Sequence, residues 1–247
     1  MPLLTRDRHD DGPGLLWLHG FTQTGASAAA FTSILAGSQK VLTPDLPGHG
    51  SQASRSASLP DTAQLLVPLL GSGADLGGYS FGGRVALHVA LAAPHLVRRL
   101  VLLSTTLGIA NEDDRATRRE RDNALASHIR EVGVEIFLRE WLAQPLFEGL
   151  TDPDVATRSR DGEGLARSLE CAGTGTQRYL ADDVAKLTMP VLIVCGVRDD
   201  KFIVAGEELR RALPQAHLSI VPHAGHAAHL EQPEYVAGLV REFLATE

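Results

Sequence analysis

The sequence has few cysteines, no excess of basic residues and no long apolar segment, and each of these deficits excludes a class of protein. Two cysteines, Cys171 and Cys195, are too few for the disulfide framework of a small secreted scaffold. The formal net charge of −7 argues against a nucleic-acid-binding protein, which would need a basic face. No uncharged apolar run approaches the roughly 20 residues that a membrane-spanning helix needs.

The first residues, the setting of one cysteine and the chain length indicate the cellular compartment and the number of domains. The first residues, MPLLTRDRHDD, show neither the apolar core nor the cleavage site of a secretory signal. Cys195 lies in the apolar run PVLIVCG, as expected of a buried thiol in a reducing compartment. We therefore expect a cytoplasmic protein, and its 247 residues suffice for one α/β domain with a substantial core.

Apolar, strand-like runs alternate with helical stretches along most of the chain. The strand candidates lie at residues 14–20, 40–45, 74–79, 99–105, 190–196 and 217–223. The helix candidates lie at residues 27–36, 60–70, 81–93, 203–213 and 233–245. This alternation predicts a mostly parallel sheet that is covered by helices on both faces.

The alternation is interrupted between residues 106 and 188. This stretch opens with NEDDRATRRERDNALASHIRE, which is dense in both charge signs, and continues with the helical VEIFLREWLAQPLF. We expect residues 106–188 to form a helical lid that is inserted into a core made of residues 1–105 and 189–247.

The stretch GGYSFGGR contains a G-x-S-x-G pattern centred on Ser80. A short apolar segment precedes it, and residues 81–93 follow as a helix that stops at Pro94. A strand before the serine and a helix after it are the context of a nucleophile elbow, in which a sharp turn exposes the serine hydroxyl.

Two later strand ends offer the acid and the histidine that a serine of this kind needs. The strand at 190–196 is followed by VRDDKF, which supplies Asp199 and Asp200. The histidine candidates after the strand at 217–223 are His223, His226 and His229. The carboxyl ends of parallel strands are where such sheets place their chemistry. No carboxylate or cysteine framework accompanies the histidines, so we expect no metal site there.

As a set, the motifs LHGFTQ, DLPGHG, GYSFGGR, CGVRDDKF and PHAGHAAHLEQP resemble the α/β-hydrolase superfamily. In that superfamily the acid stands three residues after the glycine of its strand, which selects Asp199 over the adjacent Asp200. The histidine follows a glycine in a P-x-x-G-H pattern, which selects His226. The oxyanion hole would be formed by the backbone N–H groups of Phe81, directly after the serine, and Phe21, after the first strand.

The arginine that follows the serine by one helical turn is unusual. Arg84 faces the positive end of the helix macrodipole, so an anion is expected nearby. The GYSFGGR elbow resembles that of a lyase family of the menaquinone pathway, the 2-succinyl-6-hydroxy-2,4-cyclohexadiene-1-carboxylate (SHCHC) synthases. Four further motifs resemble the same family. They are EDDRATRRERD with Arg118, the W-x-x-Q-P-x-F pattern that begins at Trp141, ATRSRDGEG with Arg158, and RDDKF with Lys201.

This resemblance implies a small substrate that carries several carboxylates and loses pyruvate, in a reaction that needs neither a metal nor a cofactor. His226, oriented by Asp199, would make Ser80 basic enough to abstract a proton from a ring carbon of the substrate. The substrate-binding residues it implies are Arg84, Arg118, Trp141, Arg158, Lys201 and Tyr79.

Alternatives remain at this stage. The arginines around Arg118 could instead form a solvated helix face paired with Glu112, Asp114 and Asp122. The same triad could serve a hydrolase of esters, thioesters or carbon–carbon bonds, and a catalytically silent binding protein of the same fold is a third possibility. The sequence predicts no oligomeric state.

Overall fold

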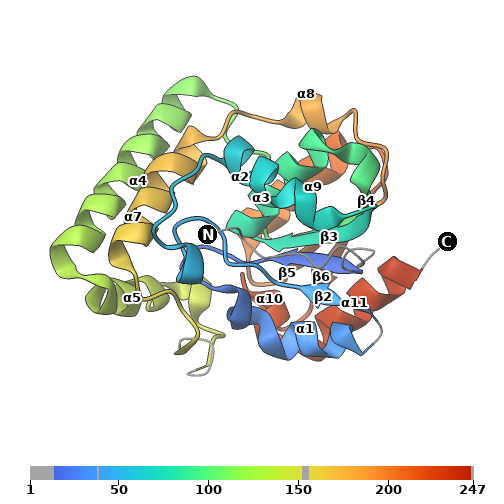
Figure 1. Ribbon diagram of the computed structural model, residues 1–247, viewed down its shortest axis with the longest axis horizontal. Coiled ribbons are helices and arrows are strands. Elements are labelled where there is room, and N and C mark those ends of the chain that lie inside the picture. Colours follow the sequence, from blue (N-terminus) through green and yellow to red (C-terminus); the bar gives the residue numbers. More distant parts are fainter. Residues whose placement is uncertain (1–13, 38, 152–155, 246–247) are drawn as a thin grey trace.

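In the computed structural model, which describes residues 14–37, 39–151 and 156–245, one parallel sheet forms the centre of the molecule (Figure 1). Its strand order is β2-β1-β3-β4-β5-β6, and every neighbouring pair among the described strands runs parallel. The strands are β1 (Leu15–Leu18), β2 (Val41–Leu42), β3 (Ala74–Tyr79), β4 (Val97–Leu103), β5 (Val191–Gly196) and β6 (Ala216–Val221). Each strand overlaps a segment that the sequence predicted as a strand, although β4 begins two residues and β6 one residue before the predicted range. The predicted α/β class is confirmed.

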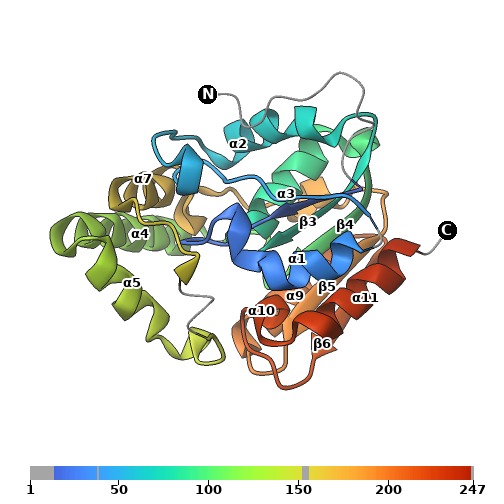
Figure 2. The ribbon, with the colours of Figure 1, turned by 60° about the horizontal axis from the view of Figure 1, so that its bottom comes forward.

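Helices cover both faces of the sheet, as Figures 1 and 2 show. One face carries α1 (Ala29–Ala36), α10 (Ala228–Glu231) and α11 (Pro233–Ala245). The other face carries α2 (Leu59–Leu66), α3 (Phe81–Ala92), α8 (Ala181–Val184) and α9 (Asp200–Ala212). Short 3₁₀ turns complete the core: η1 (Gly25–Ala28), η2 (Gly50–Gln52), η3 (Val67–Leu70) and η4 (Pro94–Leu96).

The alternation of side chains along each strand divides the core into two halves. In β1, Leu16 and Leu18 pack into the cluster beneath α2 and α3, whereas Leu15 and Trp17 pack beneath α1 and α11. Strands buried on both faces need apolar residues at every position, which is why the sequence showed continuous apolar runs instead of a polar alternation.

A separate helical layer is inserted between β4 and β5, at the left in Figure 1. It contains α4 (Glu112–Val132), α5 (Val134–Leu142), η5 (Pro145–Phe147), α7 (Gly162–Ala172) and η6 (Thr174–Thr176). Its helices bury a small apolar cluster of their own that includes Ile129, Phe137 and Leu165. The last part of the predicted range 106–188 lies on the core, because Val184 of α8 packs into the cluster beneath α3.

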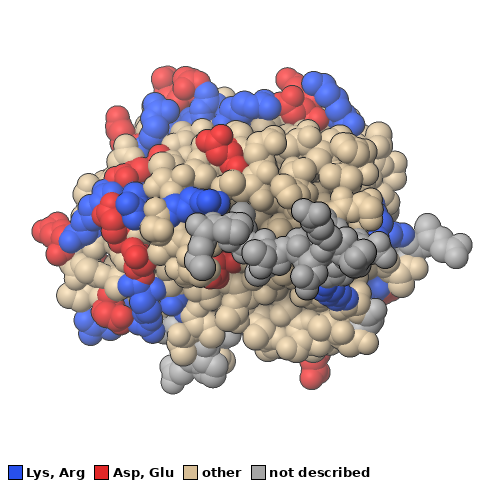
Figure 3. Space-filling model, in the orientation of Figure 1, with Lys and Arg blue, Asp and Glu red and all other residues tan. Residues whose placement is uncertain are grey.

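Charged residues of both signs crowd over the inserted layer (Figure 3). Arg130 of α4 donates hydrogen bonds to Glu163 and Glu170 of α7, at 2.8 and 2.5 Å. Such exposed pairs stabilise a fold little individually, so the apolar cluster between α4 and α7 is the main source of cohesion in this layer. None of the described helices is both long and apolar enough to cross a membrane.

Candidate active site

Ser80 lies in the turn that joins β3 to α3, and its backbone is strained. Its φ of 51° falls in the region that side-chain-bearing residues rarely adopt. The strained turn is held because Ser80 N–H donates to Leu103 O and Thr105 Oγ1 donates to Ser80 O, both at 2.8 Å. A Cβ at Gly82 would lie 2.2 Å from Leu18 O, so only glycine fits there. The predicted elbow is therefore formed in the structure.

A chain of hydrogen bonds links the serine to a buried carboxylate. His226 Nε2 lies 3.0 Å from Ser80 Oγ, and His226 Nδ1 lies 2.7 Å from Asp199 Oδ2. Because a carboxylate can only accept, Nδ1 carries the proton, which leaves Nε2 to accept the proton of the serine hydroxyl. His226 and Asp199 are both almost fully buried, whereas the neighbouring Asp200 is exposed. The geometry therefore favours Asp199 as the acid.

The other two histidines of the loop lie elsewhere. His223 is exposed, and His229 is fully buried with its ring 4.5 Å from that of Tyr79. No group of three or more His, Cys, Asp or Glu side chains within the described parts of the chain is arranged to hold a metal ion.

Two backbone N–H groups remain available beside the serine. Phe81 is the first residue of α3, so its N–H has no partner within the helix. Phe21 lies in a tight turn after β1, in which Gly20 N–H donates to Gln23 Oε1 at 2.7 Å. The N–H of Phe21 has no acceptor among the described residues. These are the two N–H groups that the sequence predicted for the oxyanion hole, and that role stays a prediction.

A cavity of about 600 Å³ lies between the elbow and the inserted layer. The core contributes Ser80, His226, Tyr79, Arg84 and Lys201 to its lining. The insertion contributes charged residues and aromatic residues, among them Arg118, Arg121, Asp122, Trp141 and Phe147. The lining of the cavity is largely apolar, and its cations come from α3, α4 and α9.

Arg84 is the most deeply buried of these cations, with 7% of its surface exposed. Its Nη1 donates to Ala172 O at 2.9 Å and to Gln177 Oε1 at 3.4 Å. Ala172 is the last residue of α7, so the negative end of that helix supplies part of the anionic partner that the sequence required. None of the described carboxylates forms an ion pair with Arg84.

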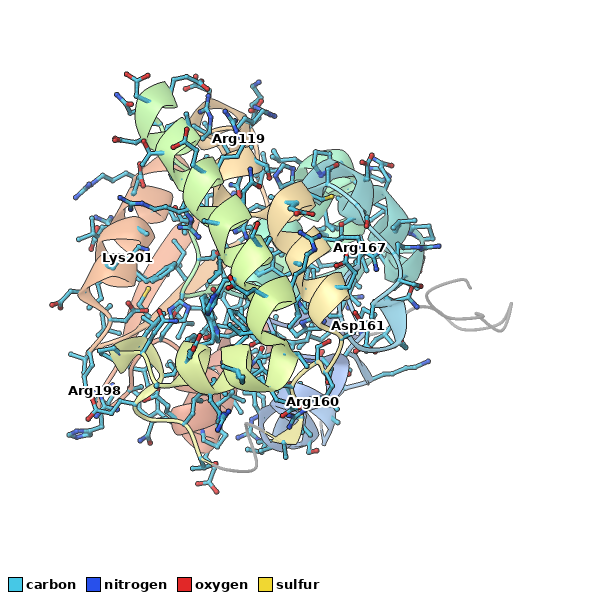
Figure 4. All side chains as sticks on the ribbon, turned by 90° about the vertical axis from the view of Figure 1, so that its left-hand side faces the viewer. Arg119, Arg160, Asp161, Arg167, Arg198 and Lys201 are labelled. Atoms are coloured by element: carbon cyan, nitrogen blue, oxygen red, sulfur yellow. The ribbon has the colours of Figure 1, made fainter. Side chains whose placement is uncertain are left out.

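The charge of Arg84 is only partly compensated. Burial, followed by the nearby charge of Arg118, lowers the pKa of the Arg84 guanidinium to about 9, against the opposing effect of Asp122. That pKa still lies above neutral pH, so the group is charged as it faces the cavity. Burial, followed by the charge of Arg118, also lowers the pKa of Lys201, which lies at the start of α9 (Figure 4).

Arg158 differs from the other predicted substrate-binding cations. It is 4% exposed, is not among the residues that line the cavity, and donates from Nη1 to Thr22 Oγ1 at 2.6 Å. Its neighbour Ser159 donates its N–H to Thr22 O at 2.8 Å. Arg158 therefore supports the turn that carries Phe21.

Tyr79 and Trp141 are aromatic walls of the cavity. The ring of Tyr79 lies 5.2 Å from that of His226, and burial raises the pKa of its hydroxyl well above the usual range. The hydroxyl therefore stays protonated at neutral pH. Trp141 packs edge-on against Phe21 at 5.4 Å, and its Nε1–H has no partner among the described residues.

Sequence reasoning missed the contribution of Glu231. Its Oε2 accepts from Gly225 N–H and from Arg198 Nη2, each at 2.9 Å. These donors are the chain neighbours of His226 and Asp199, so one carboxylate joins the two loops that carry them. A glutamate five residues after a histidine carries no recognisable pattern, and only the folded chain places it there.

The buried His229 predicts a loss of stability in acid. Burial, followed by the charges of His226 and Arg158, lowers its pKa to about 3. The unfolded chain binds this proton near pH 6.5 and the folded chain does not, so the free energy of unfolding falls as the pH falls between these values. In His229→Phe, which retains packing against Trp17, urea unfolding below pH 6 should lose about 1.4 kcal/mol less per pH unit.

The exposed His95→Gln is the control for this experiment, because it also removes a histidine but leaves the core unchanged. Equal pH slopes for His229→Phe and the unaltered protein would show that His229 does not contribute to acid lability.

Known proteins share this fold and much of this sequence. A profile of the alpha/beta hydrolase family matches residues 15–239. A Serratia proteamaculans protein named 2-succinyl-6-hydroxy-2,4-cyclohexadiene-1-carboxylate synthase is 34% identical over 247 residues, which cover 95% of this chain and 94% of that protein. A Bacillus subtilis protein that bears this name provisionally is 35% identical over 256 residues, which cover 96% and 93%.

Solved structures with a similar fold include a protein of the same kind. MenH from S. aureus superposes with a TM-score of 0.88 at 28% identity, covering 93% of this chain and 92% of that one. A thermophilic esterase from Thermogutta terrifontis with malate bound superposes with a TM-score of 0.79 at 26% identity, covering 94% and 90%. The chain therefore belongs to the alpha/beta hydrolase family and, within it, to the family of the 2-succinyl-6-hydroxy-2,4-cyclohexadiene-1-carboxylate synthases.

Proposed function

We propose that this protein is an SHCHC synthase, a lyase of menaquinone biosynthesis. It would eliminate pyruvate from 2-succinyl-5-enolpyruvyl-6-hydroxy-3-cyclohexene-1-carboxylate. The observation that carries this proposal is a hydrogen-bonded serine, histidine and aspartate that open onto a cavity lined by the buried, only partly compensated Arg84 and by further cations that are less buried. A hydrolase of neutral esters has no use for such charge, whereas a substrate with several carboxylates does.

In the proposed mechanism Ser80 is the base. Its proton passes to His226 Nε2, and the Asp199 carboxylate stabilises the imidazolium that forms. Ser80 Oγ then takes a proton from the substrate ring. The electrons of that C–H bond form a ring double bond, the bond to the enolpyruvyl oxygen breaks, and pyruvate leaves as its enolate. The N–H groups of Phe21 and Phe81 would stabilise the developing negative charge.

Two groups of residues would bind the substrate, cations that bind its carboxylates and aromatic residues that enclose its ring. Arg84, Arg118 and Lys201 would receive carboxylates, and guanidinium groups suit this role because they can bond a carboxylate through two N–H groups. Tyr79 and Trp141 would enclose the ring. The predicted contact between Arg158 and substrate remains a proposal, supported only by the proximity of its segment to the Phe21 turn.

We further propose that residues 106–188 act as a lid over a core of residues 1–105 and 189–247. The proposed setting is the cytoplasm, with a small anionic substrate and without a nucleic acid, a membrane, a metal or a cofactor.

A second candidate is a serine hydrolase. It is favoured by the similarity to the Thermogutta terrifontis esterase and by the distance of 3.0 Å between Ser80 and His226, which also suits a nucleophile. In that case Ser80 Oγ would attack an ester carbonyl instead of removing a proton.

Direct turnover decides between the two candidates. We expect pyruvate release from the enolpyruvyl substrate with a kcat/KM on the order of 10⁴ M⁻¹s⁻¹ or more. Simple acetate and butyrate esters, measured with the same enzyme, should react far more slowly. Fast ester hydrolysis without pyruvate release would replace the lyase assignment by the hydrolase.

A further inference from the structure

A buried acid lies among the cations of the cavity. Asp122 of α4 is 4% exposed and lines the cavity itself. Its Oδ1 accepts from Arg118 Nε at 2.8 Å, and its Oδ2 accepts from Gly175 N–H at 3.0 Å. A carboxylate at this place repels an anionic substrate and is costly to bury, so its presence needs a reason.

The turn after α7 packs closely against α4 near Asp122. A Cβ at Gly175 would lie 2.2 Å from Arg119 N, and one at Gly173 would lie 2.5 Å from Asp122 Oδ2. Figure 4 shows α4 and α7 side by side, with Arg119 near the upper end of the pair. Glycines at these positions let the turn approach closely enough for Asp122 to bind its backbone.

The same turn holds Arg84. The guanidinium of Arg84 donates to Ala172 O at the end of α7 and to the side chain of Gln177, just beyond η6. Asp122 accepts a hydrogen bond from Gly175, which lies between Ala172 and Gln177 in the chain. One oxygen of Asp122 therefore fixes Arg118 directly, and the other fixes the segment that holds Arg84.

The electrostatics of the two arginines agree with such a link. Arg118 and Arg84 are close enough that the charge of the first lowers the pKa of the second, and Asp122 acts in the opposite direction. A shared counter-ion lets both guanidinium groups stay in the cavity before any substrate arrives.

We propose that Asp122 is a positioning residue that sets the guanidinium groups of Arg84 and Arg118 in the orientation that receives the substrate carboxylates. This inference rests on the proposed function, because it requires a substrate with at least two carboxylates.

Asp122→Asn distinguishes positioning of the arginines from simple repulsion of the substrate, because the two roles predict opposite changes in the KM for the anionic substrate. An amide has one oxygen, so its NH₂ group would face a donor, either Arg118 Nε or Gly175 N–H. If Asp122 positions the arginines, the KM for the anionic substrate rises roughly tenfold, as expected for a buried donor that loses its acceptor. If Asp122 only repels the substrate, removal of its charge lowers KM.

Two further variants isolate the cause. Glu120→Gln makes the same change of charge on an exposed residue of the same helix, and its KM should stay within about twofold of the unaltered enzyme. Asp122→Glu keeps the charge but displaces the carboxylate, so its KM should also rise. A KM for Asp122→Glu equal to that of the unaltered enzyme would overturn the geometric part of the inference.

A merely structural role is tested with a neutral fluorophosphonate that labels Ser80. In Asp122→Asn its labelling rate should stay close to that of the unaltered enzyme, although the buried donor that loses its acceptor lowers the melting temperature by roughly 2–12 °C. A loss of labelling that parallels the loss of melting temperature would overturn the inference.

If the unaltered enzyme releases no pyruvate, the proposed function fails and calorimetry with succinate tests Asp122 separately. Weaker succinate binding by Asp122→Asn would support the inference. Equal binding, or no binding to the unaltered protein, would refute it.

Discussion

Ser80→Ala, His226→Ala and Asp199→Asn should each lower kcat for pyruvate release by on the order of 10⁴-fold. The hydrogen bonds from Ser80 through His226 to Asp199 mean that each group is effective only when the others are in place. The double variant Ser80→Ala/His226→Ala should therefore be hardly slower than either single variant. Melting temperatures measured in parallel should show that the variants remain folded.

Asp200→Asn is the matched control, because Asp200 is adjacent in sequence but exposed, and its activity should stay within about twofold of the unaltered enzyme. Independent losses that multiply in the double variant would show that the three groups do not act as one unit. A severe effect of Asp200→Asn with a mild effect of Asp199→Asn would transfer the role of the acid to Asp200.

The parts of the site that the sequence predicted are those determined by short segments at strand ends. Ser80 is recognisable because Gly78 and Gly82 are required by a turn so tight that a Cβ would contact neighbouring backbone atoms. Asp199 and His226 follow the ends of β5 and β6, and a parallel sheet brings such ends to one edge. Local pattern and sheet topology together determine these positions.

The parts that could not be predicted depend on contacts between distant segments. Arg158 was predicted at the substrate, but its contact with Thr22 joins residues 136 positions apart. Asp122 was considered only as a partner on a solvated helix face, and its bond to Gly175 arises because α4 and α7 pack together. The spacing of residues along a single helix contains no information on either contact.

Arg84 combines a feature that the sequence predicted with one that it could not predict. Its place in the first turn of α3 indicated that a negative partner was needed. The structure supplies a partial one, the carbonyl of Ala172, which comes from the inserted layer and was not foreseeable. A carbonyl dipole balances less than a full charge, and this deficit is the reason to expect a substrate carboxylate.

Arg84→Met should lower kcat/KM for the anionic substrate by about 10- to 150-fold. Methionine retains most of the aliphatic length, and the variant loses a charge-assisted hydrogen bond worth about 1.5–3 kcal/mol. Arg84→Lys should recover only part of the loss, because an ammonium group cannot bond a carboxylate through two parallel N–H groups. Steady-state kinetics with the enolpyruvyl substrate would measure both changes.

The contact between Arg84 and Ala172 O requires a control, because its loss could loosen α7 and reduce activity without any role in binding. A neutral ester that Ser80 cleaves slowly provides it, since such an ester never uses the positive charge. Arg84→Met should leave the rate on the neutral ester unchanged or raise it, while the rate on the anionic substrate falls. Equal losses on both substrates, together with a lower melting temperature, would make Arg84 a structural support of α7. The proposed lyase activity would then lose its strongest support in the cavity, and the serine hydrolase would become the better assignment.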